Sequence, residues 1–280
     1  MHTTYSSDYR SHGSAAAGNN PEEEFNPRAQ SVANFAYKED SNRRFRPYME
    51  DSHKIVDSFM GDPNQGYFAI FDGHGGSEAV DYCRNRMHEE FKKAIQNSAE
   101  DIPKAFTTCF QKVDNQLRLA GAHTSGTTVT ACLVRRENHQ RVLYLANVGD
   151  SNAVMVGSSG AQRLSQEHKG TDPSEIDRIV TSGGILIRGR VAGQLAITRS
   201  LGDHHLKTSG VSNEPYITRR VISAQDKYLV MASDGLWDVV DESQLPDGRN
   251  FNSQEVCQQL LNKALESGSQ DNIAILTVFF

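Results

Sequence analysis

The chain has 280 residues, of which 37% are hydrophobic and 23% are charged, and its formal net charge is −6. This composition excludes a wholly disordered, collagenous or coiled-coil chain, and the length gives room for one large domain or two small ones. No apolar run exceeds five residues, too few for a membrane-spanning helix, and the negative charge argues against nucleic acid and anionic membranes as partners.

Residues 1–30 are rich in Ser, Ala, Gly, Asn and Glu, and they predict a flexible tail that ends in the acidic patch Glu22–Glu24. Residues 31–280 are predicted to form one globular domain without internal repeats. Within it, apolar residues at three- and four-residue steps predict four helices. The first helix follows the glycine-rich turn at 73–76, with Ser77 as a candidate N-cap, and the second ends before Gly121. The third runs from Asp172–Pro173 to Gly183, and the fourth runs from Ser253 to Gly268.

Short apolar runs predict seven strands, at residues 67–71, 127–134, 141–148, 153–156, 193–197, 227–232 and 273–279. The connections at Arg135–Gln140 and Gly149–Asn152 have the length of hairpin loops and favour antiparallel pairing of the strands that they join. Because the helices come in pairs rather than after every strand, a repeating βαβ pattern is not expected. The predicted fold class is α+β, with helices covering the sheets.

The four cysteines are widely spaced and form no C-x-x-C pair, which is typical of a reducing compartment. The N-terminal residues contain no apolar signal segment, and His2 stands where myristoylation requires glycine. We therefore expect a protein of the cytoplasm or the nucleus. Nothing in the sequence requires more than a monomer.

Four aspartates lie at the ends of predicted buried strands: Asp72, Asp150, Asp234 and Asp271. Each alone is most often a turn residue. Four together would repel one another unless cations or positive side chains offset them. Because oxygen ligands suit Mg²⁺ or Mn²⁺ better than zinc, the pattern predicts a site for one of these ions.

Two further groups suit a phosphoester hydrolase. Arg46 precedes the acidic pair Glu50–Asp51, and its planar guanidinium can bind two phosphate oxygens, although a surface arginine is an equally good interpretation. His74 can donate a proton beside a metal, although a histidine in a glycine-rich turn is more often structural. No cysteine begins the Cys-x5-Arg motif, which excludes a thiol-based phosphatase.

With these motifs the sequence resembles the metal-dependent protein serine/threonine phosphatases of type 2C (the PPM family) from about Asn34 to Phe280, in the order of that family. The matching segments are RPYMED at 46–51, FDGHGG at 71–76, SGTT at 125–128, ANVGDS at 146–151, LAITRSLGD at 195–203, SDGLWD at 233–238 and SQDN at 269–272. The resemblance implies two stacked antiparallel sheets flanked by helix pairs, with a metal cleft at one edge of the sandwich. It also implies a flap at about residues 165–215 that borders the cleft.

The resemblance further implies hydrolysis of phosphoserine and phosphothreonine in proteins, with two Mg²⁺ or Mn²⁺ ions that activate a bridging water for in-line attack on phosphorus. In this interpretation Arg46 binds the phosphate and His74 protonates the leaving oxygen. Asp72 bridges the two ions. The Gly73 carbonyl and Glu50 bind one ion, Asp234 and Asp271 bind the other, Asp51 acts through water, and Asp150 and Asp238 join Asp234 at a weaker third ion.

One departure from the family pattern is Asn152, where the family usually has arginine. A second interpretation is a pseudophosphatase of the same fold that only binds a partner, but every metal carboxylate of the pattern is present. A third is a metallophosphoesterase for small esters, which does not share this motif order. The expected partners are phosphoserine and phosphothreonine proteins in signalling, and the sequence does not indicate which ones.

Overall fold

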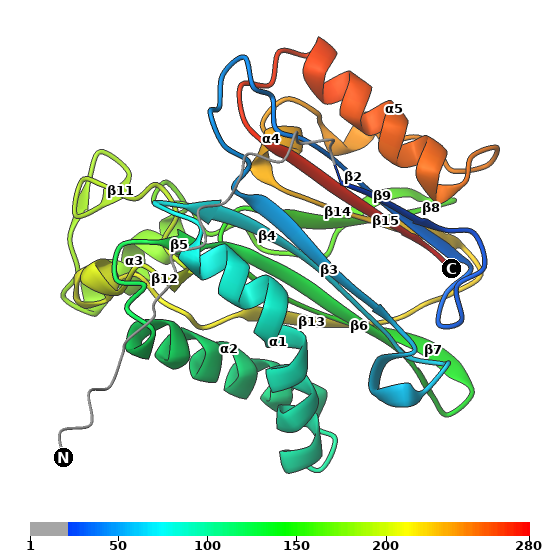
Figure 1. The fold of residues 1–280 in the computed structure, drawn as a ribbon, viewed down its shortest axis with the longest axis horizontal. Helices are drawn as coiled ribbons and strands as arrows, with labels where there is room; N and C mark the ends of the chain where they lie inside the picture. Colours follow the sequence, from blue (N-terminus) through cyan, green and yellow to red (C-terminus); the bar gives the residue numbers. More distant parts are fainter. Residues whose placement is uncertain (1–21) are drawn as a thin grey trace, which may run out of the picture.

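The computed structural model describes residues 22–280, in which two antiparallel sheets stack face to face between helices (Figure 1). The first sheet has six strands in the order β1 (Glu23–Asn26), β2 (Asn34–Asp40), β15 (Ile273–Phe279), β14 (Asp226–Ala232), β8 (Asn152–Gly157) and β9 (Gly160–Arg163). The second has seven: β12 (Leu201–Gly202), β5 (Gly126–Thr127), β4 (Gly66–His74), β6 (Val129–Glu137), β7 (Gln140–Val148) and β13 (Tyr216–Val221), with β3 (Asp51–Asp57) paired to β4.

Helices cover the outer face of each sheet, as Figure 1 shows. On the second sheet lie α1 (Glu78–Asn97) and α2 (Ile102–Leu119), and on the first lie the short α4 (Asp234–Trp237) and α5 (Ser253–Glu266). The α1–α2 pair packs through aromatic rings, with the Phe91 and Phe106 centroids 4.0 Å apart. The predicted α+β class and the four-layer arrangement are confirmed.

The helix boundaries follow local signals in the sequence. Asp101 accepts a hydrogen bond from the Lys104 amide at 3.0 Å at the start of α2, and Asn252 and Glu255 form a capping box at the start of α5. Ser77 precedes α1 as predicted, but its side chain makes no capping hydrogen bond. All four predicted helices are present, and α4 is an additional short helix.

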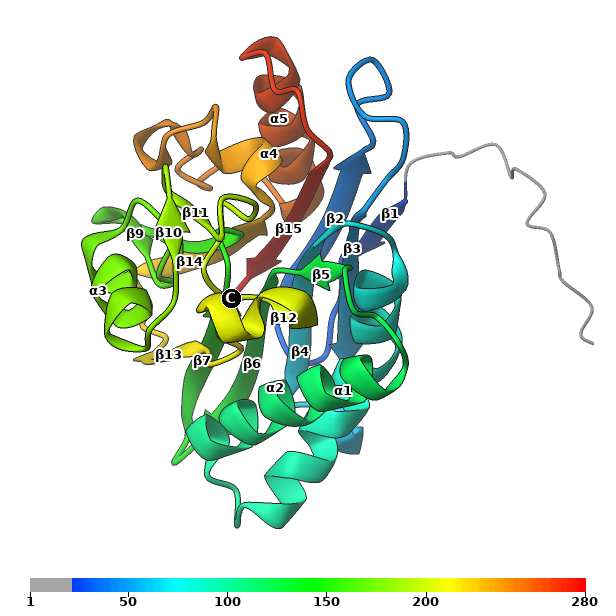
Figure 2. The same ribbon diagram turned by 90° about the vertical axis from the view of Figure 1, so that its left-hand side faces the viewer.

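We use the name flap for the segment at about residues 165–215, which the sequence predicted to border the cleft. It contains α3 (Pro173–Thr181), the small hairpin of β10 (Leu186–Ile187) and β11 (Arg190–Val191), and the 3-10 helix η2 (His204–Ser209). Figure 2 shows these elements grouped at one edge of the two sheets. Two other 3-10 helices, η1 (Phe59–Gly61) and η3 (Glu242–Gln244), lie in connections outside the flap.

One strand prediction and one hairpin prediction are wrong. Residues 193–197 form no strand but a turn with isolated bridges from Leu195 to Val191 and from Ile197 to Lys169, because Gly193 at φ 74° reverses the chain. The Gly149–Asn152 connection is no hairpin, since β7 pairs with β6 and β13 while β8 pairs with β14 and β9. Gly149, at φ 92°, lets the chain pass from one sheet to the other.

The Arg135–Gln140 connection is the predicted antiparallel hairpin, joining β6 to β7. Most of the predicted tail, residues 1–21, lies outside the described residues. Glu23–Asn26 differ from the tail prediction because they pair with β2 as an edge strand. Within residues 22–280 no helix is long and apolar enough to cross a bilayer.

Candidate metal centre

Three aspartates from distant parts of the chain meet at one end of the sandwich. Asp72 lies near the end of β4, Asp150 follows β7, and Asp234 begins α4. One carboxylate oxygen from each lies within 4.8 Å of the others. The pattern of strand-end aspartates predicted that Asp150 shares a site with Asp72 and Asp234, and the structure brings the three together; the third-ion role that the resemblance implies for Asp150 stays a prediction.

The cluster opens into a cleft of about 320 Å³. Glu50, Gly73 and Asp271 line this cleft together with the three aspartates. The backbone approaches closely next to two of these lining residues, since a Cβ on Gly235 would lie 1.9 Å from the Asn272 carbonyl oxygen. Only glycine therefore allows α4 to begin against the segment that carries Asp271.

Buried polar side chains hold the acidic residues in place. The Thr128 hydroxyl accepts a hydrogen bond from the Asp72 amide at 3.2 Å, and the Thr128 amide donates to the Asp72 carbonyl at 2.9 Å. Asn272 accepts from the Glu50 amide at 2.8 Å. Sequence reasoning gave Thr128 and Asn272 no role, although both stand in the matched segments SGTT and SQDN.

The negative charges of the aspartates in this centre are only partly compensated by positive side chains. Burial raises the pKa of Asp72 well above its usual value, and the charges of Asp51, Asp234, Asp150 and Asp271 raise it further. Burial and the charges of Asp150 and Asp271 raise the pKa of Asp234 to about 7. Positive ions placed among these oxygens would restore the ionised carboxylates, so the residues present fit hard divalent cations.

Asp51 stands behind the cleft rather than in its lining. Its side chain is buried and accepts a hydrogen bond from the Ser233 hydroxyl at 2.6 Å. Burial raises its pKa well above the usual value, against the effect of the Ser233 hydrogen bond. Its expected action through a water molecule stays a prediction.

Asp238 does not join the central cluster. It is linked to Asp150 by Lys169, whose Nζ lies 3.3 Å from an Asp238 oxygen and 3.5 Å from an Asp150 oxygen. Sequence reasoning did not single out Lys169, because nothing local to it indicates contact with either carboxylate. An ammonium group therefore lies between two of the three residues predicted to hold a third ion.

Arg46 and His74, the two predicted phosphate-handling groups, both line the cleft. The Arg46 guanidinium forms an ion pair with Asp271. His74 Nε2 lies 2.8 Å from a carboxylate oxygen of the buried Asp203. Burial alone would raise the pKa of Asp203, but hydrogen bonds from His74 and Ser200 hold it below the usual value.

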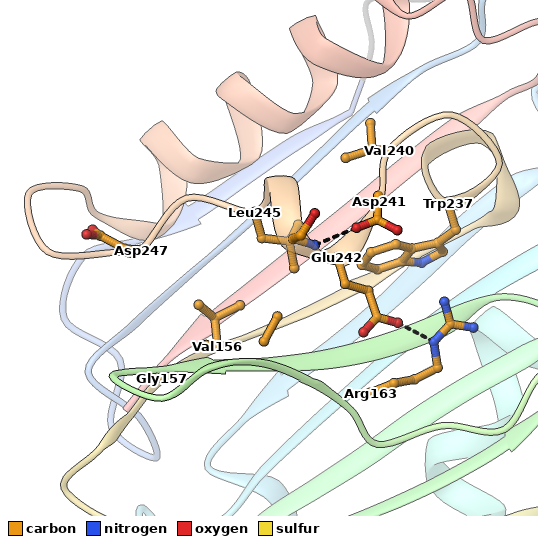
Figure 3. Close-up of a pocket in the computed structure, with 12 residues that line it drawn as sticks. Val156, Gly157, Arg163, Trp237, Val240, Asp241, Glu242, Leu245 and Asp247 are labelled. Carbon is orange, nitrogen blue, oxygen red and sulfur yellow. Dashed lines mark hydrogen bonds and ion pairs between the residues drawn. The ribbon is translucent and has the colours of Figure 1, made fainter.

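The flap supplies the remaining wall of the cleft through Arg190 and Leu195–Ile197. A second hollow of about 640 Å³ lies apart from this centre, between β8, β9 and the segment after α4 (Figure 3). Trp237 and the Arg163–Glu242 ion pair line it. None of the four strand-end aspartates lines that hollow, so the chemistry belongs to the smaller cleft.

Clustered carboxylates with an arginine and a histidine in one cleft are what metal-dependent hydrolysis of a phosphoester requires. The sequence model of the family described as Protein phosphatase 2C matches residues 35–273. The chain is 36% identical over 259 residues to Protein phosphatase 2C homolog 1 of Saccharomyces cerevisiae, covering 86% of this chain and 91% of the yeast protein. It is 37% identical over 248 residues to Protein phosphatase 2C homolog 1 of Schizosaccharomyces pombe, covering 86% and 71%.

Solved structures agree on the fold. A phosphatase from a pathogenic strain of Toxoplasma gondii superposes with a TM-score of 0.78 at 21% identity, covering 93% of this chain and 96% of that one. The chain belongs to the protein phosphatase 2C family. It is a metal-dependent enzyme that removes phosphate from phosphoserine and phosphothreonine in proteins, as predicted, and nothing favours the pseudophosphatase interpretation.

Proposed function

We propose that two divalent cations, Mg²⁺ or Mn²⁺, bind in the cleft of about 320 Å³ and that this chain uses them to hydrolyse phosphoprotein substrates. The observation that carries the proposal is the cluster of Asp72, Asp150 and Asp234, whose oxygens lie within 4.8 Å of one another. Their raised pKa values support cation binding, because ions would stabilise the charged forms. The proposed ligands are Asp72 for both ions, Glu50 and the Gly73 carbonyl for one, Asp234 and Asp271 for the other, and Asp51 through water.

When bound, the ions supply a water of lowered pKa and Lewis-acid stabilisation of the phosphoryl oxygens. The chain's own contribution begins with Arg46, whose side chain is about half exposed and now pairs with Asp271. A substrate phosphate can replace that carboxylate as the partner of the guanidinium. Arg46 would then hold the phosphoryl group in line with its attacker and offset its charge.

The leaving oxygen of serine or threonine is a strong base, so it needs a proton as the bond to phosphorus breaks. His74 is the proton donor in this proposal, because it lines the cleft beside Asp72. Asp203 fixes the ring by accepting from Nε2 at 2.8 Å.

A third cation at Asp150, Asp234 and Asp238 would have to compete with Lys169. The ammonium lies 3.3 to 3.5 Å from two of these carboxylates and already offsets part of their charge. We therefore propose that a third ion binds more weakly than the other two, and only when Lys169 moves aside.

We also propose that the enzyme acts as a monomer in the cytoplasm or nucleus. The four cysteines, all free and buried in the structure, support a reducing compartment. Size-exclusion chromatography with light scattering would test the monomer, and imaging of a tagged full chain would test the compartment.

The test of the reaction is hydrolysis of a phosphothreonine peptide by the purified chain with Mn²⁺, with Mg²⁺ and with EDTA. Turnover that requires a divalent ion and is lost in Asp72→Asn supports the two-ion centre. Unchanged turnover in EDTA, or a fully active Asp72→Asn protein, would overturn it.

A further inference from the structure

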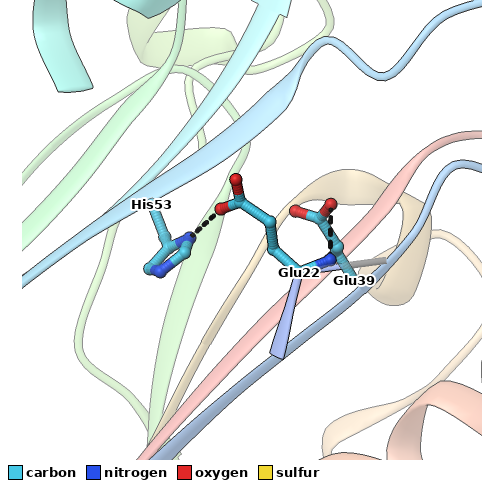
Figure 4. Close-up of side chains that lie close together, drawn as sticks. All are labelled: Glu22, Glu39 and His53. Atoms are coloured by element: carbon cyan, nitrogen blue, oxygen red, sulfur yellow. Dashed lines mark hydrogen bonds and ion pairs between the residues drawn. The ribbon is translucent and has the colours of Figure 1, made fainter. Parts of the chain in front are cut away.

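Three side chains outside the catalytic cleft converge from separate segments (Figure 4). Glu22 directly precedes β1, Glu39 lies on β2 and His53 lies on β3. A carboxylate oxygen of each glutamate and a ring nitrogen of His53 lie within 4.8 Å of one another. Glu22 belongs to the acidic patch, and neither Glu39 nor His53 has a role in the proposed reaction.

The His53 ring is held so that Nδ1 faces Glu22 and Glu39. Its side chain is only 8% exposed, and the ring stacks on Tyr37 with centroids 3.5 Å apart. Nε2 lies 3.4 Å from an oxygen of Glu24, which favours the tautomer with its proton on Nε2. Nδ1 then carries a lone pair, lies 3.8 Å from an oxygen of Glu22, and has no hydrogen-bond partner among residues 22–280.

A buried nitrogen without a partner is costly, and a metal ion is one group that would satisfy it. In metal sites, a ligating histidine commonly donates its other ring N–H to a carboxylate, which fixes the tautomer of the ring and raises the basicity of the ligating nitrogen. The position of Glu24 therefore matches that of a carboxylate behind a metal-binding imidazole.

The negative charge around His53 also favours the binding of a cation. Three carboxylates, those of Glu22, Glu24 and Glu39, surround His53, and Arg84 offsets only one of them by donating to both oxygens of Glu22 at 2.8 and 3.0 Å. The adjoining cavity of about 230 Å³ is further lined by Asp51 and Asp81. Because Arg84 offsets one of the three glutamate charges, two negative charges remain, which one divalent cation would balance.

We propose that Glu22, Glu39 and Nδ1 of His53 form a second cation site, separate from the catalytic cleft, for a transition-metal ion such as Zn²⁺. One imidazole nitrogen with two carboxylates suits Zn²⁺ better than Mg²⁺, which prefers oxygen ligands and keeps its waters. The ion would connect the segment before β1 to β2 and β3. It would therefore also fasten the edge strand Glu23–Asn26 to the sheet.

The experiment titrates Zn²⁺ into the full chain with excess Mg²⁺ present and follows the histidine ring nitrogens by ¹H–¹⁵N NMR. The His53 signal is assigned by its loss in His53→Gln. We expect the Nδ1 resonance of His53 to shift with one equivalent of Zn²⁺, and Glu24→Gln to weaken that binding by about 10- to 100-fold. His88→Gln, which removes a histidine from α1 outside the cluster, should leave the shift unchanged.

Zn²⁺ bound only in the catalytic cleft would leave the His53 ring unperturbed, so the readout separates the two sites. Glu22→Gln guards against misfolding of the His53 variant, because Glu22 is exposed and precedes the first strand. Its circular dichroism and melting in EDTA should match those of the parent while the His53 shift is lost. A His53 ring protonated on both nitrogens and insensitive to Zn²⁺ would overturn the proposal in favour of a simple ion pair, as would a shift that survives Glu22→Gln.

Discussion

One buried carboxylate, that of Glu175, connects separate segments of the flap through hydrogen bonds, and its replacement tests how much these bonds stabilise the flap. Glu175 on α3 is 1% exposed. It accepts hydrogen bonds from Arg199 at 2.6 Å, Arg178 at 2.8 Å and Thr198 at 2.6 Å. We expect Glu175→Gln to open the flap, because the variant leaves two guanidinium groups without their anion.

The magnitude follows from the pKa of Glu175. Burial alone would raise it, but the hydrogen bonds from Arg199, Arg178 and Thr198 lower it from 4.5 to about 2. That difference corresponds to about 3 kcal/mol of stability at neutral pH. Because the folded-state pKa is the lower one, this stability is present above pH 4.5 and is lost as pH falls through about 2. More than half of it should be gone near pH 3.

Native-state hydrogen exchange of the α3 amides, corrected for intrinsic rates, is the assay. At pH 7 we expect exchange in Glu175→Gln to be roughly 100-fold faster than in the parent. At pH 3 the ratio of the two exchange rates should be smaller. The matched control is Glu100→Gln, which removes a 69% exposed partner of Arg135 and should change little. An effect no larger than that of the control, or one independent of pH, would refute the reasoning.

Three further predictions concern the cleft. Asp72→Asn should abolish turnover of a phosphothreonine peptide yet raise the melting temperature in EDTA, because it removes a carboxyl group whose charged form is destabilised by burial and by the neighbouring carboxylates. A lower melting temperature would contradict this electrostatic account. His74→Gln should slow phosphopeptide hydrolysis far more than hydrolysis of an activated aryl phosphate, whose leaving group needs no proton, and equal losses would rule out the proton-donor role. Gly235→Ala places a Cβ 1.9 Å from the Asn272 carbonyl oxygen, so it should lower the free energy of unfolding in urea by about 1–3 kcal/mol. It should also weaken Mn²⁺ binding measured by calorimetry, and parent-like values in both assays would show that the backbone can shift to accept the methyl group.

Local signals in the sequence predicted the helices well. Asp172 caps α3 as predicted, and apolar residues at helical spacing on α1, α2 and α5 are buried. Strand pairing was harder to predict, because it depends on which distant strand lies alongside. Residues 149–152 have the length of a hairpin loop but connect two sheets, and Glu23–Asn26 have the composition of a tail yet pair with β2.

The sequence by itself determined which chemistry the chain carries, because the aspartates stand directly at strand ends, where backbone geometry fixes their position. Asp72 and Asp150 needed no knowledge of packing to be chosen as candidate ligands. The resemblance to the family then supplied roles for them. Motifs and strand ends are properties of short segments, so they can be recognised in the sequence without knowledge of the fold.

Only the tertiary structure decided what each charged group faces. Arg46 meets Asp271 across 225 positions of the chain, and Lys169 meets Asp238 across 69. The meeting of His53 with Glu22 and Glu39 likewise appears only when β1, β2 and β3 are in place. Electrostatic energy depends on distance in space and on burial, and both are set by the packing of the whole fold rather than by neighbours along the chain.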